Sequence, residues 1–350
     1  MRKYLAKGIK ISIFFAVGII ILYLVYQRQD AAYQAECALK GIAMADCSLL
    51  TKIAADISNA NYIWIFVIMF LFMVTNLLRA LRWKMMFRAI GYQPRMVNLF
   101  GTIMINYLAN LGIPRSGEVI RAGLLSGYED IPVEKVLGTI FTDRIFDVFM
   151  LLIVMLLTVF LGGNDFITYL NENMNFGDKL SGLFDNTLLV GVLLLFGVIT
   201  LYLLWKFRSK IYNSSLGRKL ISLFVGFSDG VQSVRKVSSI SLFLFYTVMI
   251  WVLYYFMMYL AFFSFAPTSG LGLIAGLVVF TFGSLGILIP TPGGMGSYHY
   301  LVGEALAMYG VSGADAFSFA NIMFFSIQIF VNIIFGSIAL ILLPLLNKER

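Results

Sequence analysis

The sequence is poor in the side chains that most metal and catalytic sites use. Its 350 residues include one His and two Cys. They contain neither an Asp-rich metal motif nor a His cluster, the arrangements that membrane-embedded transferases use to hold metal ions or activate a nucleophile. We therefore expect no metal site, no cofactor and no catalytic residues, and we predict that the chain is not an enzyme.

Charge is also scarce. Asp, Glu, Lys and Arg make up 13% of the residues, whereas hydrophobic residues make up 60% and the mean hydropathy is +0.88. So much apolar sequence, gathered in long blocks, exceeds what a soluble core of this size can bury. The sequence predicts an all-α polytopic membrane protein whose single domain covers residues 1–350. The net charge of +8 then indicates topology and attraction to anionic lipid headgroups, and not nucleic-acid binding.

Six apolar segments are long enough to cross a hydrocarbon core of about 30 Å. The first follows basic residues as a signal peptide would, but it has no small-residue cleavage site, so we interpret it as a retained span. Residues 27–61 are predicted to form an outer loop, and 206–238 an amphipathic connector along the cytoplasmic surface. The six predicted spans are 9–26, 62–78, 136–161, 187–205, 240–263 and 314–344.

Two further apolar stretches, 97–125 and 271–310, carry Gly and Pro near their middle. Neither half of either stretch is comfortably long enough to span, which favours re-entrant hairpins; one or two broken or tilted spans are the alternative and would give seven or eight segments. The three spans predicted between the stretches reverse the chain direction. The hairpins should therefore enter from opposite sides, as in the inverted repeats of secondary transporters. The alternative is that the two Gly/Pro breaks resemble each other only by chance.

Basic residues set the orientation, because cytoplasmic loops retain Lys and Arg during insertion. Placing the N-terminus inside puts most of the 26 basic residues on that side, so both termini are predicted to be cytoplasmic in a cell (inner) membrane. Cys37 and Cys47 then share the first outer loop. They are either joined by a disulfide or present as two free thiols.

Four motifs place charge, Gly or Pro within or beside apolar sequence: Arg79-Ala80-Leu81-Arg82-Trp83, Asn110 to Arg121, Thr142-Asp143-Arg144-Ile145-Phe146-Asp147 and Pro292-Gly293-Gly294-Met295-Gly296. In this order they resemble the flippase-like integral membrane family that includes the transmembrane half of lysylphosphatidylglycerol synthase/flippase, over about residues 60–345. The resemblance implies a helical domain that moves or handles polar lipids between leaflets. The family often has an acidic residue just after the Gly-rich motif, where this chain has Tyr298-His299, with Glu304 later.

Arg115, Glu118 and Arg121 can form one charged face on a short helix after Gly117. Arginine offers two parallel donors to a phosphate, which suits a phospholipid or a lipid-linked phosphate. The alternative is an ordinary Arg–Glu pair that holds the hairpin at the cytoplasmic interface. We predict substrate binding, because charge is costly inside a membrane.

Asp143 and Asp147 lie at i and i+4 on one face of their span, with Arg144 turned by about 100°. These charges must face the protein interior and find partners, most simply Arg115 or Arg121 of the hairpin. They are predicted to form a gate or an ion-pair network. Both roles are compatible.

The turn formed by Pro292, Gly293, Gly294 and Gly296 can present backbone amides to an anion, or can merely allow close helix packing. His299 and Glu304 are assigned to the gating network, where His299 could couple transport to protons, although a single His near a helix start is more often simply hydrogen-bonded. The end of the second span carries Arg79, Arg82 and Trp83. These side chains are expected to snorkel to the lipid interface, or to recruit lipid headgroups.

These features favour a polar-lipid flippase or transporter whose partners are membrane lipids with anionic headgroups. A non-transporting partner or scaffold of a cell-envelope lipid or glycan enzyme is the alternative, and the chain can form an oligomer or bind an enzyme partner. Since only Asn347 to Arg350 follow the last span, we expect no lysyl transfer by this polypeptide.

Overall fold

The computed structural model contains only helices among the regular elements of its described residues. This confirms the all-α class. The predicted span at 187–205, nearly all of the span at 9–26 and most of the connector lie outside the described residues, as do Arg115, Pro292 and Gly293. The structure describes residues 20, 22–24, 26–31, 33–35, 37–38, 47–113, 116–174, with the backbone alone at 164–174, and 225, 227–289, 291 and 294–348.

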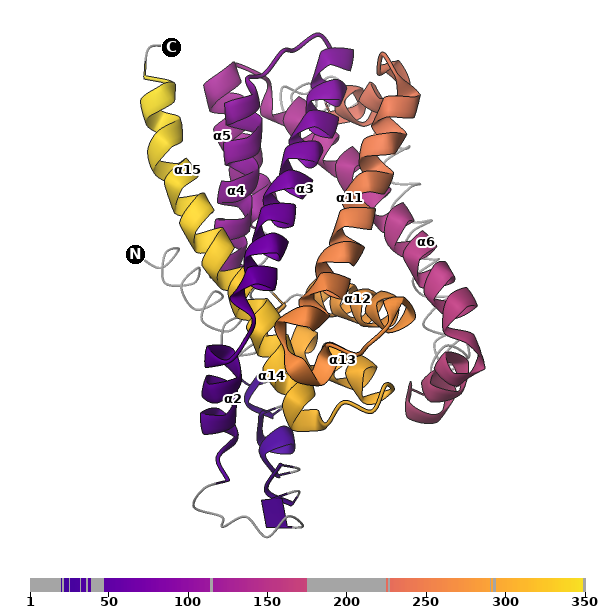
Figure 1. Cartoon of the computed structure of the whole chain (residues 1–350). Coiled ribbons are helices and arrows are strands. Elements are labelled where there is room, and N and C mark those ends of the chain that lie inside the picture. Colours follow the sequence, from indigo (N-terminus) through magenta and orange to yellow (C-terminus); the bar gives the residue numbers. More distant parts are fainter. Residues whose placement is uncertain are drawn as a thin grey trace, which may run out of the picture.

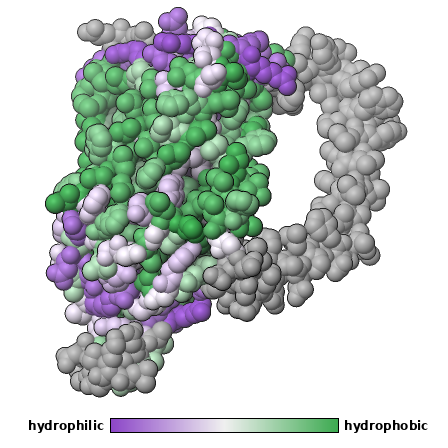
Figure 2. Space-filling view, turned by 45° about the vertical axis from the view of Figure 1, so that its right-hand side comes forward, coloured by the Kyte–Doolittle hydropathy of each residue, from purple (hydrophilic) through white to green (hydrophobic). Residues whose placement is uncertain are grey.

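Four helical segments in the described part are long and apolar enough to cross a membrane. They match the predicted spans at 62–78, 136–161, 240–263 and 314–344, and an apolar belt separates the more polar upper and lower ends in Figure 2. The chain is thus a multi-pass membrane protein. The segments are α3 (Tyr62–Ala89), the Val133–Gly163 part of α6 (Val133–Met174), α11 (Ile240–Ala261) with its extension to Ser264, and α14 (Gly313–Met323) continued by the π-helix η6 (Phe324–Val331) and α15 (Asn332–Leu346).

Both broken stretches form helical hairpins. The first consists of α4 (Met96–Gly112) and α5 (Gly117–Glu129), the second of α12 (Leu273–Leu288) and α13 (Ser297–Ala307). With 17 residues, α4 is about 25 Å long and does not cross the core alone. In Figure 1, α4 and α5 lie beside the upper part of α3, whereas α12 and α13 lie at the lower end of α11. The hairpins therefore occupy opposite ends of the bundle.

A glycine marks the close approach of the two helices within each hairpin. A Cβ atom on Gly117 would lie 2.2 Å from the carbonyl oxygen of Asn106, and one on Gly286 would lie 2.7 Å from Cα of Tyr298. Backbone atoms cannot yield as side chains do. Only glycine therefore allows each pair of helices to meet as it does.

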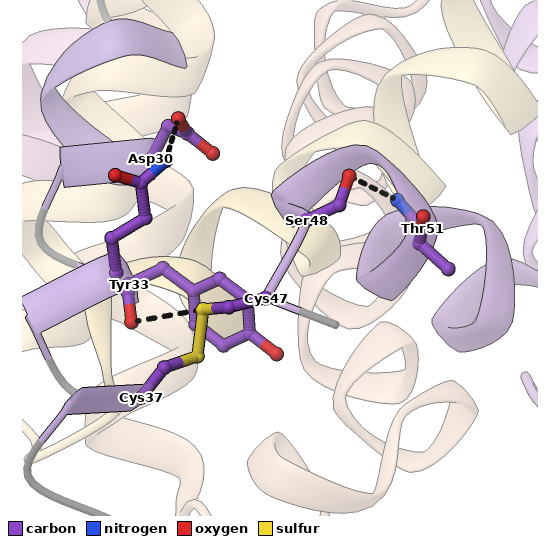
Figure 3. The surroundings of a disulfide bond; sticks show 7 residues. Asp30, Tyr33, Cys37, Cys47, Ser48 and Thr51 are labelled. Atoms are coloured by element: carbon purple, nitrogen blue, oxygen red, sulfur yellow. Dashed lines mark hydrogen bonds between the residues drawn. A yellow bond between two sulfur atoms is a disulfide. The ribbon is translucent and has the colours of Figure 1, made fainter. Parts of the chain in front are cut away.

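Part of the predicted outer loop 27–61 is helical. Residues 49–58 form α2 (Leu49–Ser58), and the Ser48 hydroxyl caps it by accepting from the Thr51 amide. Figure 3 shows Cys37 joined to Cys47 by a disulfide beside this cap. Lys52 Nζ lies 2.6 Å from carboxylate oxygens of both Asp56 and Asp315. These charges attach α2 to α14, so the segment is held against the bundle.

The described end of the connector packs against α6. Gly138 and Gly230 meet so closely that a Cβ on Gly138 would lie 2.3 Å from the carbonyl oxygen of Phe227. Thr142 donates a hydrogen bond of 3.3 Å to the carbonyl of Val231. This part of the connector is therefore fixed to the bundle, while the predicted surface helix before residue 225 lies outside the described residues.

Candidate functional site

A buried ion-pair cluster joins α3 to α6. Arg82 donates to Asp143, and its Nη2 also lies 3.0 Å from Asp147 Oδ1. Arg79 Nη2 lies 3.0 Å from Asp147 Oδ2. Asp143 and Arg82 have no exposed surface, and Arg79 is 4% exposed. Charges removed from water to this degree persist only when they are paired and hydrogen-bonded.

The partners of the two aspartates differ from those predicted. Arg79 and Arg82, and not Arg115 or Arg121, pair with Asp143 and Asp147. The predicted snorkelling of Arg79 and Arg82 to the interface is likewise wrong. Helix α3 continues to Ala89, so these two residues lie about two to three turns before its end, and their side chains are buried in the bundle.

A second ion pair connects the first hairpin to α6. Arg144 Nη2 lies 2.7 Å from Glu118 Oε1, and Arg144 Nη1 lies 3.6 Å from Asp147. The Arg144 side chain is 39% exposed, whereas that of Arg82 is fully buried. The carboxylate of Glu118 thus bonds across to α6 and not along its own helix. Arg144 is the accessible arginine of the arrangement.

Arg121 has no carboxylate partner within 4 Å among the residues that the structure describes. Its guanidinium carbon lies 4.2 Å from the ring centroid of Trp83, and the residue is 1% exposed. The Trp83 indole donates a hydrogen bond of 2.9 Å to Thr139 on α6, which fixes the ring. Nε and Nη2 of Arg121 have no hydrogen-bond partner among the described residues. Trp83 is therefore a buried cation–π platform and not the interfacial anchor that was predicted.

The charges of the cluster do not balance. Around the α3–α6 contact, the described residues include four arginines and three carboxylates, which leaves one positive charge in excess. An anionic group would complete the arrangement. The arginines are Arg79, Arg82, Arg121 and Arg144, and the acids are Glu118, Asp143 and Asp147.

A cavity of about 340 Å³ opens beside this cluster, within the volume range of small-molecule sites. Its lining includes Arg79, Arg144 and Asp147 of the cluster, and Gly283 and Tyr298 of the second hairpin. Its remaining wall is largely aromatic and aliphatic. Wall residues include Phe72, Tyr107, Trp251, Tyr254, Phe280 and Phe324. The cavity therefore lies between the ion-pair cluster and the second hairpin.

The rim of the cavity is apolar and exposed. Val148 of α6 and Ile287 and Leu288 of α12 line it with exposed fractions of 54%, 46% and 50%. Both helices are apolar, and the Val133–Gly163 part of α6 is long enough to cross a membrane. Among the described residues, exposed apolar side chains of α6 and α12 thus border the cavity.

The π-helix η6 contributes to the cavity wall. Phe324, Ile327 and Gln328 line the space from within this eight-residue stretch. π-helical turns are rare and occur often at functional sites. Their wider winding here changes the direction of side chains in the last span at the point where it faces the cavity.

The described part of the Gly-rich turn serves packing. Gly294 and Gly296 adopt φ of +83° and +82°, which favours glycine. The Ser297 hydroxyl donates to the carbonyls of Gly286 at 2.8 Å and Gly294 at 3.1 Å, and so closes the turn on α12. Neither glycine lines the cavity.

His299 and Glu304 lie apart from the ion-pair cluster. The His299 ring is 1% exposed and packs on Phe324 and Phe317, with centroid distances of 4.8 Å and 5.7 Å. Glu304 pairs with Arg28 at 3.4 Å. The structure therefore does not bring these two residues into contact with Asp143, as the predicted network required.

Sequence reasoning did not identify the aromatic wall. Trp251 and Tyr254 lie at i and i+3 on α11, but aromatic residues at helical spacing are equally typical of packing positions. Thr247, which lies on α11 as well, is the one usable signal: Arg82 of α3 donates a hydrogen bond of 3.1 Å to its hydroxyl. A polar residue one turn before the aromatic pair marks the face of α11 that meets the charged face of α3.

Comparison with known proteins supports the resemblance found in the sequence. The family described as "Lysylphosphatidylglycerol synthase TM region" matches residues 42–336. This range contains both hairpins, the ion-pair cluster and the cavity. No curated protein and no solved structure matches the chain.

Proposed function

Because the chain belongs to the family of the lysylphosphatidylglycerol synthase transmembrane region, we propose that it moves or handles an anionic phospholipid or lipid-linked phosphate between leaflets. The proposal places the protein in the cell (inner) membrane with both termini cytoplasmic. It assigns no catalytic step and no cofactor to the chain. Its partners are membrane lipids.

The observation that carries this proposal is the position of Arg144 at the cavity. Arg144 lines the space and is accessible, whereas the side chains of Arg79 and Arg82 are at most 5% exposed and already hold two carboxylates. A guanidinium can bind a phosphate through two parallel hydrogen bonds. The excess positive charge of the cluster favours an anion at this place.

The apolar rim fits a lipid whose phosphate lies at Arg144. A phosphate at Arg144 would leave acyl chains to pass Val148, Ile287 and Leu288 into the surrounding lipid. The headgroup could then enter the protein without the chains leaving the hydrocarbon core. This is the physical requirement for moving a polar head across a bilayer, because exposing that head to the core is costly.

Leaflet exchange in liposomes tests the proposal. Purified protein is reconstituted, and exchange of fluorescent phosphatidylglycerol is followed by quenching of the outer leaflet. We expect Arg144→Gln to lower the protein-dependent rate at least about tenfold, since a phosphate bond to a charged donor contributes roughly 1.5–3 kcal/mol. Arg144→Lys should retain part of the rate, because it keeps the charge but loses the bidentate geometry.

Arg235→Gln is the matched control, because Arg235 is exposed and does not line the cavity. It should exchange lipid at the wild-type rate. Wild-type protein that is folded but exchanges neither phospholipids nor polyprenyl-phosphate sugars would contradict transport. That result would favour the role of a partner or scaffold for a cell-envelope enzyme.

A further inference from the structure

We propose that Arg121 is the second counter-ion of Glu118 and takes up this carboxylate when a lipid phosphate displaces it from Arg144. This inference rests on the proposed function, because it assumes that the phosphate binds Arg144. It assigns Arg121 a positioning role away from the cavity. It also links the occupancy of the cavity to the first hairpin.

Glu118 already occupies the position that a substrate phosphate would take. One carboxylate oxygen lies 2.7 Å from Arg144 Nη2, and the other oxygen, Oε2, is buried with no hydrogen-bond partner among the described residues. A carboxylate and a phosphate compete for the same guanidinium donors. An incoming phosphate must therefore displace Glu118 from Arg144.

The Glu118 side chain is 26% exposed and its Oε2 is buried, so a displaced Glu118 favours another cation, since an unpaired carboxylate with little access to water is costly. Arg79 and Arg82 are engaged with Asp143 and Asp147. Arg121 is the remaining arginine of the cluster. It is 1% exposed, and its Nε and Nη2 have no partner in the part of the chain that the structure describes.

The two residues are placed to meet. They lie at i and i+3 on α5, where side chains are neighbours on the helix surface and a Glu that precedes its basic partner is favourably oriented. The exchange therefore needs a change of side-chain rotamers and no refolding of α5. Before it, Arg144 and Glu118 are paired and Arg121 rests on Trp83; after it, phosphate–Arg144 and Glu118–Arg121 are both paired.

The exchange changes what holds the first hairpin. In the structure, Glu118 ties α5 to α6 through Arg144. Once Glu118 pairs within α5, this tie is released. Lipid binding would then free the inner end of the hairpin beside the cavity, which couples ligand entry to hairpin movement.

A double-mutant cycle on lipid affinity tests the inference. Binding of short-chain phosphatidylglycerol to the purified full-length protein in detergent is measured by calorimetry. Glu118→Gln removes the competitor, so affinity should rise about fivefold, the effect of a partly exposed ion pair. Arg121→Gln removes the cation that would pair with the displaced carboxylate, and affinity should fall by a similar factor.

The double variant separates this role from a structural one. If Arg121 acts through Glu118, Glu118→Gln with Arg121→Gln should bind as tightly as Glu118→Gln alone. The inference is overturned if Arg121→Gln lowers the affinity of the Glu118→Gln variant by the same factor as it lowers that of the wild-type protein. Arg121→Lys should remain close to wild type, and it serves as the folded comparison if Arg121→Gln melts early.

The outcomes also distinguish the two proposals. Wild-type protein that binds neither phosphatidylglycerol nor polyprenyl-phosphate sugars would overturn both. Wild-type binding that Arg144→Gln abolishes, together with additive effects in the cycle, would retain lipid binding at Arg144 and overturn only the exchange of partners. Unchanged affinity in Glu118→Gln would show that the carboxylate does not compete with the phosphate.

Discussion

Asp143 has no exposed surface and accepts a hydrogen bond from Arg82 while Arg79 lies 3.8 Å away. Asp143→Asn would remove the negative charge but keep the shape, and leave two buried arginines to share Asp147. We expect it to destabilise the protein by about 3–5 kcal/mol, the cost of breaking a buried ion pair. The midpoint of thermal unfolding in detergent, compared with wild type, measures this loss.

Asp130→Asn is the control for that substitution. Asp130 is exposed and adopts φ of +51° at the end of α5, a conformation that Asn accepts as readily as Asp. Its unfolding midpoint should remain that of wild type. Equal midpoints for Asp143→Asn and wild type would show that the cluster does not hold α3 against α6.

The sequence identified most of the charged residues of the site but paired them wrongly. Charge within apolar sequence is conspicuous, whereas the neighbours of a helix in space are not written in its own pattern. The signal for the correct partners was present in α3. Thr75, Asn76, Arg79, Arg82 and Trp83 repeat every three or four residues and are all buried. Ending the span at 78 concealed this polar face.

At the scale of elements, Gly117 determines how closely the first hairpin closes. A methyl group there would meet the Asn106 carbonyl oxygen at 2.2 Å and Asn106 Oδ1 at 2.7 Å. We expect Gly117→Ala to lower stability by about 1–3 kcal/mol, because overpacking must move backbone. The unfolding midpoint in detergent gives the change in stability.

Gly123→Ala provides the comparison within the same helix. A Cβ on Gly123 would meet no atom within 4 Å, and Ala favours helix over Gly by about 1 kcal/mol. This variant should be as stable as wild type or more so. If Gly117→Ala behaved in the same way, α4 and α5 would not be in the close contact that the structure shows.

The hairpins were predictable because Gly and Pro interrupt the apolar stretches at a point that leaves two short helices. The π-helix η6 was not. Around Phe324–Val331 the sequence is apolar on nearly every side, so its periodicity does not distinguish α from π winding. The aromatic wall of the cavity escaped prediction for the same reason, since lipid-facing and cavity-facing positions of α11 look alike in sequence.

At the scale of the whole molecule, the basic residues predict an orientation that labelling can test. The link between α3 and α4 contains Gln93, and the link between α11 and α12 contains Gly270; both residues are exposed. Single cysteines are introduced at these positions in a protein that carries Cys37→Ser and Cys47→Ser. A membrane-impermeant maleimide is then added to intact cells, or to cells permeabilised beforehand.

We expect Gly270→Cys to be labelled in intact cells and Gln93→Cys only after permeabilisation, because cytoplasmic loops retain the basic residues. The parent without cysteines should stay unlabelled. The reversed pattern would invert the protein in the membrane but keep the hairpins opposed. Labelling of both positions from one side would contradict the opposed hairpins themselves, since Gln93 precedes the first hairpin and Gly270 the second.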